Sequence, residues 1–415
     1  MRSKEKIILH SDMNNFYASV ECMLNPKLRD KYVAVCGRQK DRHGIVLAKN
    51  EKAKALGVAT GEPVWKAKQK CPQLVTVEPH FDLYMKYSKM AHEIYYKYTD
   101  LIEPFGMDEC WLDVSGSTLL YGSGKEIADK IRNDIKRELG LTVSIGVSFN
   151  KIFAKLGSDM KKPDAVTCIE RENFREKVWV LSASELLGVG RATTKTLARH
   201  GIYTIGQLAA ADPNYLRKWL GVNGVRLWNF ARGTGGTNVA PYSYTPPIKS
   251  IGHGITCTAD LSSDAEVRKV MFALSRDISH RLRKHGLMAR GVSVSARDTE
   301  LRSREFQCLT NKPTRNSIEL TDRGFELFKR NYDWKHQVRA VSIRAFGLVS
   351  ENEPIQIEMS DNVNRELKRD KIEQTMEEIR KMFGKYAVSY AGLMGELKLP
   401  GEAEINPVMP GMVYA

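Results

Sequence analysis

The stretch FGMDECWLDV, residues 105–114, places two adjacent carboxylates, Asp108 and Glu109, inside an apolar sequence typical of a β-strand. Successive side chains of a regular strand point to opposite faces of the sheet. Both carboxylates can serve one site only if the strand is interrupted beside them, and Gly106 permits a hairpin turn there. The surrounding segment therefore predicts strand, turn, strand. A solvated hairpin tip is the alternative explanation for the pair.

A third carboxylate, Asp12, ends the buried strand predicted over KIILHS (residues 6–11). The residues after it, NNFYASVECML, have the apolar spacing of a helix face, so the strand is expected to deliver Asp12 to a turn. Three carboxylates that converge repel one another, and burial raises their pKa values unless a cation compensates. Mg²⁺ suits such a site because it prefers oxygen ligands and takes few carboxylates together with substrate phosphates.

The charge of the chain points to a polyanionic partner. In 415 residues, 64 Lys and Arg face 49 Asp and Glu, which gives a net charge of +15. An excess of this size favours nucleic acid as the partner. Residues 250–350 hold 18 basic against 11 acidic residues, whereas residues 351–415 hold 8 against 12. We therefore expect the polyanion to bind outside the tail.

The remaining composition predicts a cytoplasmic protein. Seven cysteines are scattered without a CxxC pair, which is typical of reduced thiols. The N-terminus has an apolar core too short for a signal peptide, and no run approaches the roughly 18 apolar residues of a membrane helix. We expect no membrane partner.

The order of predicted elements indicates an α+β protein with several domains. Helices are expected over residues 82–99, 125–138 and 150–160, with LTVSIGVS (141–148) as a strand between the last two. A segment rich in Gly and Pro, residues 233–249, reads as a linker. A second α+β domain with helices at 264–284 and 321–331 follows, and then a tail with one helix at 364–383.

Two glycine-containing turns predict contacts with phosphates. LLGVGRATTKTLARHG fits a helix-hairpin-helix, in which a turn exposes backbone N–H groups at a helix N-terminus. WLGVNG is a second such turn. The glycines concerned are Gly188, Gly190, Gly221 and Gly224. Basic residues beside the strands of the second domain are further candidates for DNA binding, although an ordinary solvated face would look the same: Arg297, Arg302, Arg304, Arg339 and Arg344.

Three ordered motifs resemble those of a known family. HSDMNNFYASVE (10–21), PFGMDECWLDVSGS (104–117) and SIGVSFNKIFAKLGSDMKKP (144–163) are together similar to the palm motifs of Y-family translesion DNA polymerases, closest to the DNA polymerase IV branch. The resemblance covers about residues 6–350. It implies a right-hand α+β fold with these parts: palm, 1–21 and 79–172; small fingers, 22–78; helix-hairpin-helix thumb, 173–234; linker, 235–249; α+β little finger, 250–350; tail with one helix, 351–415.

The same resemblance implies roles for individual residues. Asp12, Asp108 and Glu109 are the catalytic residues and would hold two Mg²⁺ ions, with the backbone carbonyl of Met13 as a further ligand. Tyr17 falls at the steric gate that excludes a ribose 2′-hydroxyl, although its periodicity also fits a core aromatic.

Three further residues would contact the nucleotide. The resemblance places Phe16 beside the sugar, or alternatively in the core, and Lys162 at the incoming triphosphate. The fingers depart from the family pattern, because the usual Thr, Tyr and Arg are replaced by Ala48, Glu51 and Lys54. Lys54 retains a positive charge without the bidentate geometry of a guanidinium. Glu51 is expected to point away or to pair with Lys49 or Lys52.

The implied function is DNA-directed DNA synthesis, the transfer of a nucleotide from a dNTP to a primer 3′-hydroxyl, in translesion and error-prone repair synthesis. The expected partners are primer-template DNA and dNTP, and the protein is expected to be a monomer. QIEMS (356–360) weakly resembles a sliding-clamp-binding peptide and is otherwise a connector. An alternative function is a polymerase-like DNA-binding recruiter with weak or no synthesis. A nucleotidyl cyclase shares the paired carboxylates but would not need the helix-hairpin-helix turns.

Overall fold

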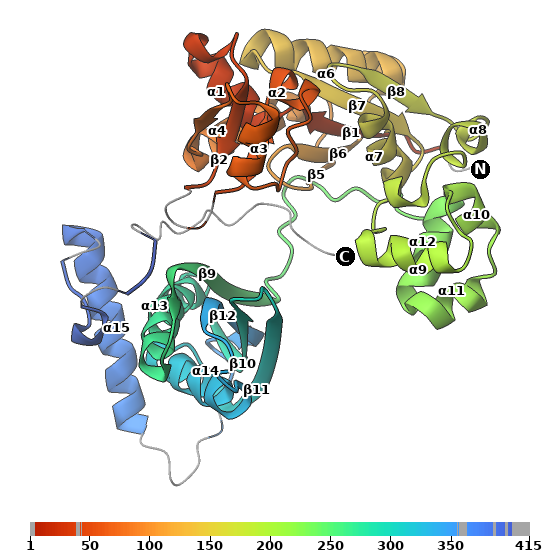
Figure 1. Ribbon diagram of the computed structural model, residues 1–415. Coiled ribbons are helices and arrows are strands. Elements are labelled where there is room, and N and C mark those ends of the chain that lie inside the picture. The colour runs from red at the N-terminus through yellow and green to blue at the C-terminus, as the bar shows by residue number, and fades with distance from the viewer. Residues whose placement is uncertain are drawn as a thin grey trace. The chain divides into compact units, whose positions relative to one another are not determined.

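The stretch at residues 105–114 forms a hairpin in a five-stranded sheet (Figure 1). Strands β5 (Ile102–Pro104) and β6 (Glu109–Asp113) pair in antiparallel orientation, and Phe105 N donates a hydrogen bond to Glu109 O at 2.8 Å. Between them Gly106 has φ of 133°, a backbone conformation that favours glycine. The predicted strand, turn, strand and the interruption at Gly106 are confirmed.

Strand β1 (Ile8–Met13) lies in the middle of this sheet, whose order is β5-β6-β1-β7-β8. β7 spans Val143–Ser148 and β8 spans Val166–Ile169. β1 ends at Met13, one residue past Asp12, where the predicted strand stops, and the predicted turn follows at residues 14–15. Asp12 pairs with Glu109 on one side and with Ser144 on the other.

Helices cover both faces of the five-stranded sheet. Side chains of β1 alternate, so that Leu9 packs in one apolar cluster with α6 (Gly124–Leu139), while Ile8 packs on the other side with Ala154 of α7 (Lys151–Met160). The Asn150 side chain caps α7 by accepting a hydrogen bond from Phe153 N at 2.7 Å. The helices predicted at 125–138 and 150–160 are confirmed.

The rest of the first unit, residues 5–37 and 45–245, adds a small sheet and two groups of helices. The small sheet has the order β3-β2-β4, with β2 at Val33–Cys36, β3 at Val46–Lys49 and β4 at Val75–Val77. The helices before residue 125 are α1 (Phe16–Leu24), α2 (Glu51–Ala55), α3 (Val64–Lys70), α4 (Phe81–Tyr96) and α5 (Thr118–Tyr121). Those after residue 170 are α8 (Phe174–Val178), α9 (Arg191–Arg199), α10 (Ile205–Ala210), α11 (Pro213–Leu220) and α12 (Val222–Ala231). Short 3₁₀ helices lie at Pro26–Leu28 and Ala183–Glu185.

The segment predicted as a linker has no helix or strand between Arg232 and Lys249, yet its first half is held against the first unit. Ala240 N donates a hydrogen bond to Glu103 Oε2, and Tyr242 N donates one to Asp100 O, both at 2.9 Å. Each bond fixes the backbone beside β5.

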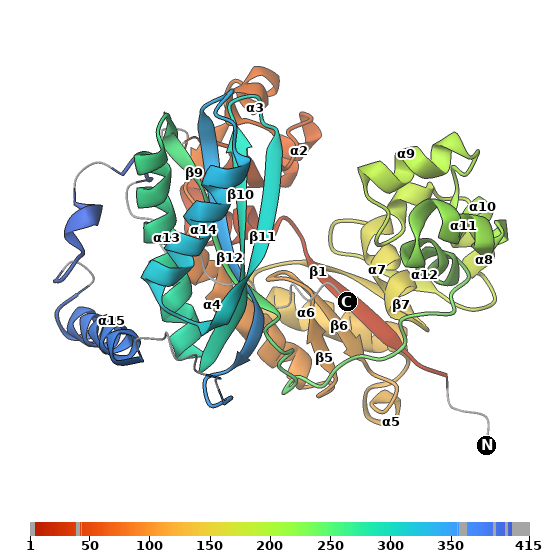
Figure 2. The ribbon, with the colours of Figure 1, turned by 90° about the horizontal axis from the view of Figure 1, so that it is seen from below.

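The second unit, centred on residues 246–400, is a four-stranded antiparallel sheet with two helices packed on one face (Figure 2). Its order is β11-β10-β12-β9. The strands are β9 (Ser250–Leu261), β10 (Leu287–Asp298), β11 (Ser303–Thr314) and β12 (Val338–Ser350), and the helices are α13 (Asp264–Lys284) and α14 (Ser317–Asn331). Alternate residues of β10 and β12 face the helices and form the core. The prediction of a second α+β domain agrees with this arrangement. Helix α14 begins four residues earlier than predicted because the Asn316 side chain caps it.

The tail contains helix α15 (Val363–Phe383) and a 3₁₀ turn at Ala391–Leu393. Figure 2 shows α15 beside α13. The computed structural model describes these residues: 5–38, 42, 44–354, 356, 363–384, 387–394 and 397–400. Within those ranges, no helix has the length and apolar character needed to span a membrane.

A close approach of β7 to α7 depends on Gly146, and this gives the first prediction. A Cβ at this position would lie 1.8 Å from the carbonyl oxygen of Ala154, which is backbone and cannot move aside. We expect Gly146→Ala to lower the free energy of unfolding by about 3 kcal/mol, measured by urea unfolding. Gly116→Ala is the control, because its Cβ would meet nothing within 4 Å. Equal stability of the two variants would contradict the packing argument.

Candidate functional site

The pairing of β1 with β6 brings the three predicted carboxylates together. Asp12 lies opposite Glu109 in the antiparallel register, and Met13 N donates a hydrogen bond to Asp108 O at 2.9 Å. Asp108 belongs to the hairpin turn, and Glu109 is the first residue of β6. Only one of the two lies in the strand, so their side chains need not point to opposite faces of the sheet. Asp12 is only 6% exposed. The three acidic groups thus lie together at one end of the β1–β6 strand pair in the five-stranded sheet.

Two lysines supplied by α7 and the residues just after it neutralise part of this charge. Lys162 Nζ lies 2.6 Å from Asp12 Oδ2 and 2.9 Å from Asp159 Oδ1. Lys155 Nζ forms an ion pair with Glu109 Oε2. Lys162 was predicted from the sequence and Lys155 was missed. Lys155 and Asp159 are four residues apart on one face of α7, and this spacing ahead of Lys162 is the signal that could have identified Lys155.

The three carboxyl groups differ in pKa. Burial raises the pKa of Asp12 to about 7, even though the charge of Lys162 acts in the opposite direction. Burial and the neighbouring Glu109 raise the pKa of Asp108. Burial would also raise the pKa of Glu109, but the contact with His10 and the charge of Lys155 outweigh it and hold that pKa at about 2. The site therefore carries negative charge that the fold only partly compensates.

His10 is a buried neighbour that sequence reasoning did not find. Its Nδ1 lies 2.8 Å from Ser158 Oγ, and its Nε2 lies 3.4 Å from Glu109 Oε2. Ser158 Oγ also lies 2.7 Å from Lys155 O, so the serine joins the imidazole to helix α7. Burial lowers the pKa of His10 to about 4, so the ring is neutral at pH 7. The imidazole therefore packs behind Glu109 without adding a full charge.

The donor set fits a hard divalent cation. All three groups offer carboxylate oxygens, the ligand type that Mg²⁺ prefers. Within the described ranges no three His, Cys, Asp or Glu side chains are close enough to ligate an ion as they stand, and lysine ammonium groups engage two of the three carboxylates. Asp108 forms no ion pair among the described residues, and its raised pKa reflects charge that a cation would stabilise.

Tyr17, in the first turn of α1, lies beside the three carboxylates. Its ring stacks on Tyr84 with centroids 4.3 Å apart and planes 11° apart, and its hydroxyl lies 3.6 Å from Met107 Sδ in the hairpin turn. Burial and the nearby charge of Asp108 raise the Tyr17 pKa to about 12. The half-buried ring is thus fixed next to the site, while Phe16 is buried in the core.

The fingers-like segment holds Glu51 in a different contact from those expected. Its Oε1 accepts a hydrogen bond from Asn15 Nδ2 at 2.7 Å and lies 3.4 Å from Lys54 Nζ. The expected partners were Lys49 or Lys52. Lys49 instead donates to Thr60 Oγ1 at 2.9 Å, and Lys52 pairs with Asp30. Helix geometry explains the difference, because Glu51 and Lys54 are three residues apart on α2.

Comparison with known proteins places the chain in a family. Residues 11–159 match the model of the impB/mucB/samB family, and residues 248–359 match its C-terminal domain. DNA polymerase IV of Acetivibrio thermocellus is 49% identical over 92% of this chain and 96% of its own length. The chain belongs to the Y family of DNA polymerases, in the DNA polymerase IV branch. The family predicted from the three sequence motifs is therefore confirmed.

Other relatives agree with this assignment. DNA polymerase IV 1 of Bacillus subtilis is 36% identical over 92% of each chain. A solved structure titled "Y-family DNA polymerase chimera Dbh-Dpo4(243-245)-Dbh" matches with a TM-score of 0.72 and 24% identity, over 83% of this chain and 99% of that one. The right-hand α+β fold is confirmed. The chain is a DNA-directed DNA polymerase of the translesion class, it acts on primer-template DNA and dNTP, and its family depends on divalent metal ions.

In this polymerase the predicted glycine turns lie at two helix N-termini. Gly190 precedes α9 and Gly221 precedes α12, and a Cβ at either would meet nothing within 4 Å, so the backbone there is open. Gly188 has φ of 92° in the first turn. Gly224 differs, because it lies inside α12, where a Cβ would be 2.2 Å from Leu216 O. Close helix packing is reason enough for a glycine at that position.

The five predicted DNA-binding arginines are not equivalent. Arg344 and Arg297 lie on the sheet face that points away from α13 and α14, and Arg344 pairs with Glu305. Arg304 pairs across the sheet with inward-facing Ala296 and lies 3.6 Å from Asp333. The other two differ again, because Arg302 forms an ion pair with Glu300 and Arg339 is half-buried. DNA would have to displace acidic partners of three of the five.

The opposite pKa shifts of Asp12 and Glu109 give the second prediction. The raised Asp12 pKa means that its contribution to stability is present below pH 4 and is lost as the pH rises through 7. The lowered Glu109 pKa means the reverse, with stability lost as the pH falls toward 2. With metal chelated at pH 8, we expect Asp12→Asn to stabilise the protein and Glu109→Gln to destabilise it, each by about 1–3 kcal/mol.

The stabilising effect of Asp12→Asn should disappear at pH 5, where wild-type Asp12 is already protonated. Thermal unfolding at both pH values measures the two variants together. A stability change of the same sign in both variants at pH 8 would show that the assigned shifts are wrong.

Proposed function

We propose that Asp12, Asp108 and Glu109, with the Met13 carbonyl, form the metal site at which this polymerase joins a dNTP to a primer 3′-hydroxyl. The observation that supports this is the β1–β6 register, which sets three partly uncompensated carboxylates at one sheet edge. Two bound Mg²⁺ ions would lower the pKa of the attacking hydroxyl and stabilise the leaving pyrophosphate. The protein itself contributes positioning and charge.

The two lysines orient the carboxylates and offer positive charge to the substrate. Lys155 fixes Glu109 in contact with His10, so that this carboxylate stays ionised at any physiological pH. Lys162 is 26% exposed, and the charge of Asp12 outweighs burial and raises its pKa to about 12. We propose that Lys162 turns from Asp12 to the triphosphate once a cation takes its place beside the carboxylate.

Tyr17 is proposed as the sugar gate. Its ring is supported from behind by Tyr84, whose hydroxyl donates to Glu21 Oε1 at 2.6 Å. A ring held in this way cannot yield to a 2′-hydroxyl without breaking a buried hydrogen bond. Phe16 is buried in the core with its ring near both Tyr17 and Tyr84, so we propose that it supports the gate and does not contact the sugar itself.

The alternative of a DNA-binding recruiter with weak synthesis draws on one observation. Lys54 of α2, which stands in place of the family's arginine, lies 3.4 Å from Glu51, so part of its charge is compensated before a triphosphate arrives. This favours weak nucleotide binding over loss of activity, because the carboxylate site is intact. Lys54→Arg together with Glu51→Ala would strengthen dNTP binding if this contact limits it.

Binding of the duplex is proposed to use the backbone of the two glycine turns and the arginines of the second unit, with affinity that falls steeply with salt. We propose a monomer in the cytoplasm, the latter supported by seven unpaired thiols. The clamp-binding proposal concerns residues 356–360, of which only Gln356 belongs to the described ranges.

Loss of one carboxylate tests the metal site. We expect Asp108→Asn to lower primer extension with Mg²⁺ by about a hundredfold or more, because one ligand charge is removed. Duplex binding should be unchanged. Glu93→Gln removes one exposed carboxylate from α4 and serves as the control. Wild-type extension rates in Asp108→Asn would exclude the proposed site, whereas an inactive wild type that binds DNA would favour the recruiter.

Sugar selection tests the gate. We expect Tyr17→Ala to raise incorporation of ribonucleotides relative to deoxyribonucleotides by about 10- to 200-fold, because a steric clash is removed. Single-nucleotide incorporation kinetics with paired rNTP and dNTP give the ratio. Tyr203→Ala, which removes an exposed tyrosine ahead of α10, is the control. An unchanged ratio in Tyr17→Ala would assign this ring to the core alone.

A further inference from the structure

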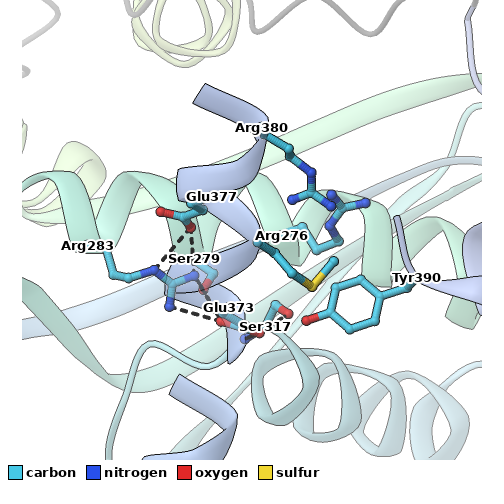
Figure 3. Close-up of a pocket in the computed structure, with 9 residues that line it drawn as sticks. Arg276, Ser279, Arg283, Ser317, Glu373, Glu377, Arg380 and Tyr390 are labelled. Carbon is cyan, nitrogen blue, oxygen red and sulfur yellow. Dashed lines mark hydrogen bonds and ion pairs between the residues drawn. The ribbon is translucent and has the colours of Figure 1, made fainter. Parts of the chain in front are cut away.

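A solvent-open cavity lies between α13 and the tail helix α15 in the second unit (Figure 3). Its walls come from three helices and from the segment after α15: Arg276, Ser279, Arg283, Ser317, Glu373, Met376, Glu377, Arg380 and Tyr390. The polymerase site does not use these residues. The proposed polymerase function therefore does not explain this cavity.

The acidic groups of the cavity are already occupied. Glu373 is 5% exposed and accepts hydrogen bonds from Ser279 Oγ at 2.9 Å and Ser317 N at 3.0 Å. Arg283 lies 2.9 Å from Glu373 and 2.7 Å from Glu377. His280 lies 3.2 Å from the other oxygen of Glu377. This network docks α15 on α13 and leaves no carboxylate for a further cation.

Two guanidinium groups of the cavity have no acidic partner among the residues that the structure describes. Arg276 comes from α13 and Arg380 from α15, and Figure 3 shows them side by side. Among the described residues no carboxylate lies within ion-pair distance of either. Arg380 donates to Val388 O at 2.8 and 3.0 Å, and Arg276 lies 5.5 Å from the ring centroid of Tyr390. Burial lowers the pKa of both arginines, and the charge of Arg380 further lowers that of Arg276.

Tyr390 completes the site. Its ring is set by an edge contact with Phe272 at 5.0 Å, and Figure 3 shows its hydroxyl directed into the cavity. Two planar guanidinium forks and a phenol hydroxyl are donors that match the oxygens of a phosphate group. A doubly charged phosphate would also neutralise both arginines.

We propose that Arg276, Arg380 and Tyr390 form a binding site for a phosphate group, which bridges α13 and α15. The phosphate belongs either to a free anion or to a DNA backbone, since both present the same oxygens. Without an anion the two like charges oppose the docking of α15. With it, docking is stabilised, because a ligand that binds only the docked form shifts the equilibrium toward that form. The site is independent of the polymerase chemistry.

Hydrogen exchange of α15 in the full-length protein tests the proposal. Inorganic phosphate is titrated at constant ionic strength set by chloride, and in a second series a single-stranded oligonucleotide replaces it. We expect protection of α15 to rise with at least one of the two. In Arg276→Gln/Arg380→Gln the binding that produces this protection should weaken by about tenfold or more. Protection by phosphate alone identifies the free anion, and protection by both ligands extends the site to a DNA phosphate.

Two further variants separate phosphate binding from simple packing. Arg276→Gln alone should weaken the phosphate-dependent protection of α15 and leave its protection in phosphate-free buffer close to that of the wild type, whereas loss of a merely structural arginine would lower protection in both buffers. Lys269→Gln and Lys371→Gln remove exposed charges from α13 and α15 and should respond to phosphate like the wild type. The proposal is overturned if neither ligand protects α15, or if the double variant responds like the lysine controls.

Discussion

The antiparallel register of β1 with β6 is the constraint on which the rest of the site depends. It sets Asp12 opposite Glu109, and the turn at Gly106 frees Asp108 from the alternation that would turn it to the far face. A shift of one residue would exchange the two faces of β1 and send Leu9 from the α6 side of the sheet to the α7 side. Both faces are buried, and each accepts different side chains, since His10 contacts Ser158 on one face and Ser11 contacts Tyr95 on the other. These specific contacts are lost in another register, so they hold the acidic groups in position.

Electrostatics then determine the state of the site. Carboxylates that converge in a buried place cost free energy, and helix α7 offsets part of it by supplying Lys155, with Lys162 directly after the helix. The close approach at Gly146 lets α7 lie near enough to do so. What remains is uneven, since Glu109 is stabilised as an anion while Asp12 and Asp108 are not. This imbalance is what makes the edge of the sheet receptive to a cation, and it connects the packing of a helix with the chemistry of the polymerase.

The second unit shows a different use of charge. Its tail is acidic overall, and carboxylates of α15 meet Arg283 of α13, which lies in the most basic part of the sequence. The same interface also brings together two arginines that have no carboxylate partner in the described part of the chain. Net charge over a long segment therefore does not say where an anion binds. The acidic tail contributes a cation, Arg380, to the proposed phosphate site. This is possible because the fold decides separately for each charged side chain which partner it meets.

The strand, turn, strand around Gly106 and most helices could be predicted from the sequence, because apolar periodicity and capping residues act locally. Three motifs indicated the family and the candidate site residues Asp12, Asp108, Glu109, Tyr17 and Lys162. The contacts between distant residues could not be predicted: Asp12 pairs with Glu109 between β1 and β6, Lys155 and His10 flank Glu109, and Glu51 contacts Asn15 and Lys54. The position of Arg276 on α13 next to Arg380 on α15 could not be predicted from the sequence either. Each of these contacts joins residues whose positions are set by strand register or helix packing, and spacing along the chain carries no record of which partner a charged side chain will meet.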